Sequence, residues 1–155
     1  MIYVLTTFLF LSFTGFILSV AAHIASIAGI FIPGGNAVMG LHGGIFIVWI
    51  PTVIIMMRVT KGARRKDSWK IALSGCPPWM RGALYVLFAY AFLNFFLFAS
   101  QQTNKGHDKE QGVTAETIRG FSGHWMLFYG TAFATIYSAV KSPSLLRGRK
   151  CPNGH

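Results

Sequence analysis

Residues 1–57 read MIYVLTTFLFLSFTGFILSVAAHIASIAGIFIPGGNAVMGLHGGIFIVWIPTVIIMM and contain no Asp, Glu, Lys or Arg. Over all 155 residues, 53% are hydrophobic and 12% are charged, which is about half the charged share of a soluble domain. A globule of this size has too little interior to bury such a stretch. A bilayer core of about 30 Å, however, is crossed by about 20 apolar residues in a helix. The stretch therefore predicts an all-α integral membrane protein.

Four apolar runs predict a bundle of four transmembrane helices in a single membrane domain. The first run is too long for a signal peptide and lacks a basic segment before it, so we interpret it as the first span. The expected spans are residues 2–32, 37–57, 82–99 and 117–140. The expected connections are a basic loop at residues 58–81, an outer loop at 100–116 and a tail at 141–155.

The net charge of +10 is concentrated in two segments. Seven basic residues lie in the basic loop: Arg58, Lys61, Arg64, Arg65, Lys66, Lys70 and Arg81. Four lie in the tail: Lys141, Arg147, Arg149 and Lys150. The positive-inside rule places both segments, and so both chain termini, on the cytoplasmic side. We expect a bacterial cytoplasmic (inner) membrane, with lipids as neighbours. Anionic headgroups, rather than nucleic acid, are the expected partner of the basic face.

Small and polar residues predict which helix faces point inward, because lipid does not sort apolar side chains between helices. In the first helix they follow one heptad-like stripe: Ser12, Gly15, Ser19, His23 and Ser26. In the fourth helix they follow another: His124, Thr131, Thr135 and Ser138. Asn94 is the one amide in the third span, and an amide in lipid needs a partner. We therefore expect Asn94 to face the bundle.

Polar residues also predict helix starts. Thr114 is placed to cap a helix that continues into the fourth span. In the basic loop, residues 67–73 are predicted to form a short interfacial helix. Asp67 or Ser68 would cap this helix, and Gly75 would end it.

Three histidines are the candidate functional residues. His23, His42 and His124 each lie near the predicted outer end of a span, so their imidazoles could meet there. One reading is structural, with each ring hydrogen-bonded to neighbouring helices. A second is a b-type haem with His42 and His124 as axial ligands. A third is a copper or zinc ion held by His23, His42 and His124.

The remaining chemistry of the sequence argues against an enzyme that acts alone. The chain has four acidic residues in total and lacks nucleotide-binding, hydrolase and metalloprotease motifs. The predicted third helix, in contrast, is rich in aromatic residues. We therefore expect a small, non-catalytic membrane subunit or accessory protein that packs against other membrane protein subunits. The alternative is a small redox protein that uses the outer histidines to bind haem, copper or zinc.

Overall fold

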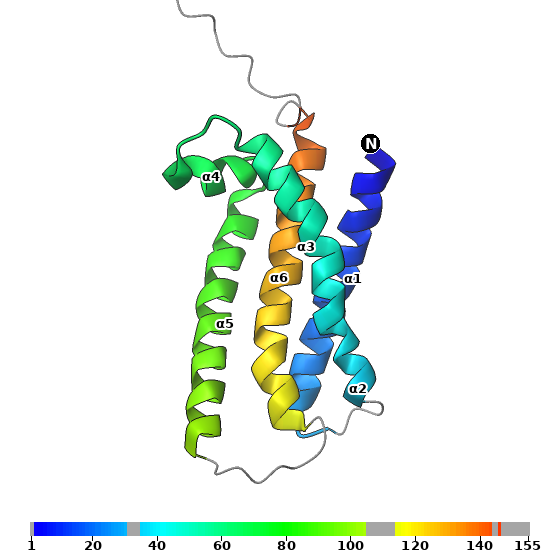
Figure 1. The fold of residues 1–155 in the computed structure, drawn as a ribbon, viewed down its shortest axis with the longest axis vertical. Helices are drawn as coiled ribbons and strands as arrows, with labels where there is room; N and C mark the ends of the chain where they lie inside the picture. The colour runs from blue at the N-terminus through cyan, green and yellow to red at the C-terminus, as the bar shows by residue number, and fades with distance from the viewer. Residues whose placement is uncertain (1, 31–34, 105–113, 144–145, 147–155) are drawn as a thin grey trace, which may run out of the picture.

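The computed structural model describes residues 2–30, 35–104, 114–143 and 146, and all the regular structure in these residues is helical. The elements are α1 (Ile2–Ile27), α2 (Gly35–Val38), α3 (Gly40–Val59), η1 (Arg65–Asp67), α4 (Ser68–Ala72), α5 (Pro78–Asn104) and α6 (Ala115–Lys141). Figure 1 shows the four long helices lying alongside one another, with α6 between α5 and the pair α1 and α3. The short helices α2 and α4 lie at opposite ends of the bundle.

Three of the described helices are long and apolar enough to cross a membrane: Tyr3–Ile27, Gly40–Val59 and Pro78–Gln101. The first three apolar runs therefore form helices of the predicted kind, with the length and hydropathy that a membrane span needs. The helix α6, at the fourth run, is as long as α5 but does not reach the same hydropathy. Its small and polar residues account for this lower value, and most of them lie inside the bundle.

The first helix ends five residues earlier than predicted, at Ile27 instead of residue 32. Gly29 has a φ of 67°, which an L side chain rarely adopts. The N–H of Ile30 donates to the carbonyl of Ala25, and the N–H of Gly29 donates to that of Ser26. These two bonds form a Schellman motif, which satisfies the last carbonyls of a helix. Gly29 therefore ends the helix, although the apolar sequence on both sides of it had predicted that the helix continues.

The other helices also differ from the predicted spans at their ends. The third run, predicted at residues 82–99, becomes a helix from Pro78 to Asn104, and proline is well suited to a first helical position. As predicted, Thr114 caps α6, where its side chain accepts from the N–H of Thr117 at 3.2 Å. The short helix α4 forms as expected, but Asp67 at its N-cap makes no side-chain capping bond.

The core of the bundle is centred on α6. Its contact with α1 is the most extensive between any two elements, and α3 and α5 also pack against it. All five residues of the predicted α1 stripe are buried, as are Thr131, Thr135 and Ser138 of α6. His124, the fourth member of the α6 stripe, is half-buried. Asn94 of α5 donates to the carbonyl of Arg119 at 2.8 Å. The predicted inward faces are therefore confirmed.

The segment before α5 is attached to α6 by two polar contacts. The N–H of Gly75 donates to Ser138 Oγ at 2.9 Å, and Cys76 Sγ donates to the carbonyl of Ala134 at 3.1 Å. Burial raises the pKa of the Cys76 thiol, which opposes formation of the reactive thiolate. These contacts fix the end of the basic loop against the bundle.

Candidate functional site

The three predicted histidines lie on three different helices, His23 on α1, His42 on α3 and His124 on α6. The structure divides them into two groups. His42 and His124 are neighbours, with ring centroids 5.5 Å apart and ring planes at 86°. His23 instead contacts residues of α5 and α6.

His23 links three helices through a chain of hydrogen bonds. Its Nδ1 lies 2.7 Å from Ser122 Oγ of α6, and its Nε2 is hydrogen-bonded to the hydroxyl of Tyr90 on α5. Ser122 in turn donates to the carbonyl of Arg119 at 3.2 Å. A single assignment of hydrogen atoms gives each of these polar groups a hydrogen-bond partner. The Tyr90 hydroxyl donates to His23 Nε2, and His23 Nδ1–H donates to Ser122 Oγ. The neutral imidazole is thus fully paired, which is the structural arrangement that lipid favours.

His42 and His124 are packed among aromatic rings. The indole N–H of Trp125 donates to His42 Nδ1 at 2.9 Å. Phe121 contacts both histidines edge to face, with ring centroids at 5.8 Å from His42 and 5.4 Å from His124. Trp125 itself is fully buried, so this hydrogen bond lies inside the protein.

The chemistry of His42 does not fit a metal ligand in this arrangement. A neutral imidazole that accepts at Nδ1 carries its proton on Nε2, so neither nitrogen keeps a free lone pair. Within the described residues, no group of three His, Cys, Asp or Glu side chains is placed to hold a metal ion. Haem binding by His42 and His124, or copper or zinc binding by His23, His42 and His124, therefore stays a prediction of the sequence. Either would require His42 to give up its hydrogen bond from Trp125.

Tyr129 joins the same region to α1 and α3. Its ring lies against Gly15 of α1, and its hydroxyl lies against Gly44 of α3. That hydroxyl donates to the carbonyl of Leu41 at 2.9 Å. Only glycine leaves room at these two positions, because a Cβ on either residue would overlap Tyr129. The small residues of α1 and α3 therefore serve close helix packing.

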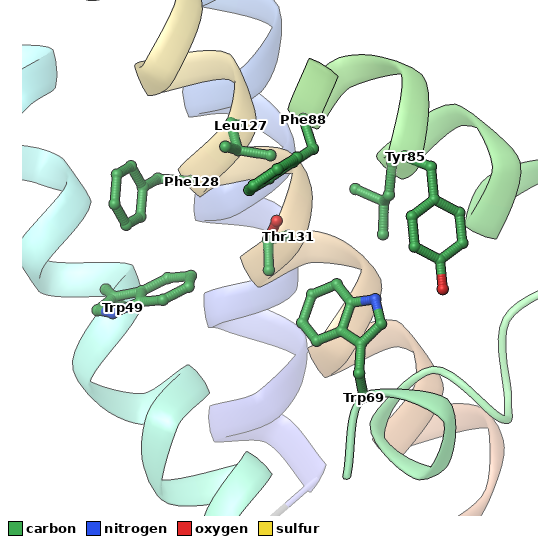
Figure 2. Close-up of a pocket in the computed structure, with 8 residues that line it drawn as sticks. Trp49, Trp69, Tyr85, Phe88, Leu127, Phe128 and Thr131 are labelled. Carbon is green, nitrogen blue, oxygen red and sulfur yellow. The ribbon is translucent and has the colours of Figure 1, made fainter. Parts of the chain in front are cut away.

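A second feature is an apolar cavity of about 470 Å³ between α3, α4, α5 and α6. Figure 2 shows the aromatic side chains that surround it. The walls are Trp49 of α3, Trp69 of α4, Tyr85 and Phe88 of α5, and Phe128 and Thr131 of α6. Trp49 and Phe128 touch edge to face, with ring centroids 4.9 Å apart. Its volume lies within the range of small-molecule sites, about 300–1,000 Å³.

The sequence did not identify the partners of the histidines. Tyr90 belonged to an aromatic helix with no distinguishing feature, and Trp125 was one of several large apolar residues. Ser122 lies two residues before His124 and could have been recognised only as a further small residue. All three assignments depend on how the helices are rotated against each other, which a single sequence does not specify.

Comparisons with known proteins give no match: no family model, no curated protein and no solved structure is similar to this chain.

Proposed function

We propose that this chain is a four-span membrane protein with cytoplasmic termini that serves as a non-catalytic subunit or accessory protein of a larger membrane complex. The observation that carries the proposal is the outward surface of α5. This helix packs mainly against α6, and most of its large side chains are exposed. The expected location is the bacterial cytoplasmic membrane.

The proposed fourth span is α6. Its 27 residues extend about 40 Å at 1.5 Å per residue, which is enough to cross a bilayer core of about 30 Å. Because α1, α3 and α5 surround it, its buried serines and threonines would not face lipid. With α6 as a span, the basic loop and the basic tail lie on one side, as the positive-inside rule requires.

The surface of α5 differs in kind from those of α1 and α3. Of the eleven exposed large aromatic residues in the described part of the chain, seven belong to α5. These are Trp79, Tyr85, Phe88, Tyr90, Phe92, Phe95 and Phe96. The exposed faces of α1 and α3 are mostly aliphatic. Aromatic residues are enriched at protein interfaces, so a partner helix is expected on α5.

Site-specific photocrosslinking in native membranes tests this proposal. A benzophenone derivative of phenylalanine would replace Phe92 or Phe96 on α5. The matched controls are Phe10 on α1 and Phe46 on α3, which are as exposed: all four lie between 61% and 68%. We expect adducts to another membrane protein from Phe92 and Phe96 and few from the controls. Adducts at none of the four sites, together with a monomer that purifies alone in mild detergent, would contradict the proposal.

A further inference from the structure

The aromatic cavity in Figure 2 has the depth of one membrane leaflet. Trp49, Phe88 and Thr131 line it, and each lies ten residues from the end of its helix that faces the basic loop. Ten residues correspond to about 15 Å along a helix. This is half of the bilayer core of about 30 Å. The cavity therefore runs from α4 toward the middle of the membrane.

Beyond that depth, aromatic rings fill the space next to α5. Phe95 contacts His124 with ring centroids 6.4 Å apart, and Phe98 contacts Phe121 at 5.9 Å. A transmembrane partner helix would need a groove along the whole length of the bundle. The cavity instead suits a flexible apolar chain that enters from one leaflet.

Basic residues next to the cavity indicate which lipid headgroup such an acyl chain would carry. Trp69 of α4 lines the cavity, and Lys66 and Lys70 lie one helical turn apart on either side of it. Both lysines are exposed. Arg81 lies one turn before the lining residue Leu84, and its buried Nε has no hydrogen-bond acceptor among the described residues. These cations favour a headgroup with a net negative charge, such as that of an anionic phospholipid, over a zwitterionic or neutral headgroup.

We infer that an anionic phospholipid binds at this cavity. One acyl chain lies against Trp49, Phe88 and Phe128, and the phosphate contacts Lys66 and Lys70, with Arg81 as a further donor. Trp69 lies between the two parts of the lipid, at the depth where tryptophan is enriched in membrane proteins. The inference rests on the membrane placement proposed above but not on a protein partner.

Quenching of tryptophan fluorescence by brominated lipids tests the inference. The purified variant Trp49→Phe/Trp79→Phe keeps Trp69 as the reporter beside the buried Trp125. It would be placed in phosphatidylcholine nanodiscs that contain a small fraction of brominated phosphatidylglycerol or brominated phosphatidylcholine. We expect Trp69 to prefer the anionic lipid by about fivefold for each contributing lysine.

The matched control is the variant Trp49→Phe/Trp69→Phe, which reports through the exposed Trp79 outside the cavity. There we expect equal quenching by both lipids. In the Trp69 reporter, Lys66→Gln/Lys70→Gln should lower the preference for the anionic lipid, and the further substitution Arg81→Gln should abolish it. Thr131→Phe fills the cavity and should reduce quenching by both lipids.

Equal quenching of Trp69 by the two lipids would overturn the inference, as would a preference that is unchanged when both lysines and Arg81 are replaced. The same preference at Trp79 would indicate a general surface charge effect and would also overturn it. These nanodiscs contain no partner subunit, so a negative result leaves the subunit proposal intact. Conversely, a failure of crosslinking from α5 leaves the lipid site intact.

Discussion

At the level of single residues, several polar side chains in this bundle are paired across helices. The His23 ring bonds to Ser122 on α6 and to Tyr90 on α5, and Asn94 on α5 bonds to α6. Each pairing removes a polar group that would otherwise be unsatisfied in lipid. These side chains therefore determine which helix faces meet, while the surrounding apolar surface gives little directional preference.

Loss of the Ser122 hydroxyl should destabilise the protein. In Ser122→Ala, Nδ1–H of His23 loses its acceptor inside the bundle, and we expect a cost of about 1–2 kcal/mol. Reversible unfolding in mixed detergent micelles measures it. The matched control is Ser100→Ala, because Ser100 is exposed and donates to the carbonyl of Leu97 on its own helix. Equal stabilities of the two variants would show that the His23 hydrogen bonds do not stabilise the fold.

At the level of the helices, glycines allow α1 and α3 to approach α6. Tyr129 of α6 occupies the space beside Gly15 and Gly44, and its hydroxyl bonds to the backbone of α3. Helices in lipid gain from such close packing, since no hydrophobic effect drives them together. Tyr129 and the two glycines thus form one packing unit that joins α1, α3 and α6.

The Gly15→Ala substitution should disturb this unit. The added methyl group would overlap the Tyr129 ring, and overpacking of this kind costs about 1–3 kcal/mol. Gly43→Ala is the control, because its added Cβ would meet no neighbouring side chain or helix within 4 Å in the described structure. The thermal melting temperature in detergent should fall for Gly15→Ala and stay the same or rise for Gly43→Ala. A melting temperature of Gly15→Ala that is not lowered would mean that α1 and α6 are farther apart than the structure shows.

At the level of the whole molecule, charge and hydropathy give an orientation. Helix α5 connects the basic loop to the opposite end of the bundle, and α6 returns to the first end (Figure 1). The four-span proposal therefore places Ser74 and Ser142 on the cytoplasmic side and Ser100 outside.

Cysteine labelling at these three serines tests the topology. The background carries Cys151→Ser and keeps Cys76, whose burial and raised pKa make it a poor competitor for the reagent. With an impermeant maleimide, Ser100→Cys should react in intact cells. Ser74→Cys and Ser142→Cys should react only after the membrane is opened. Reaction of Ser142→Cys from outside would show that α6 does not cross the membrane.

Part of the site could be expected from the sequence, because local patterns carried the information. Polar residues at heptad spacing identified the buried face of α1, and the lone amide Asn94 identified the inward face of α5. Whether the three histidines contact one another could not be predicted from their spacing along the sequence. Their depths along the helices agreed, yet rotation of α1 turned His23 toward Ser122 and Tyr90 instead of toward His42.

The sequence by itself determined the apolar helices, their inward faces and the concentration of charge in two segments. Each of these depends on composition or on a short period along one chain segment. Only the tertiary structure decided that α6 is the centre of the bundle, that Trp125 pairs with His42, and that five aromatic rings from α3, α4, α5 and α6 enclose a cavity. These features depend on the rotation and separation of whole helices. Polar pairings between helices and many weak packing contacts set both, and no single segment contains them.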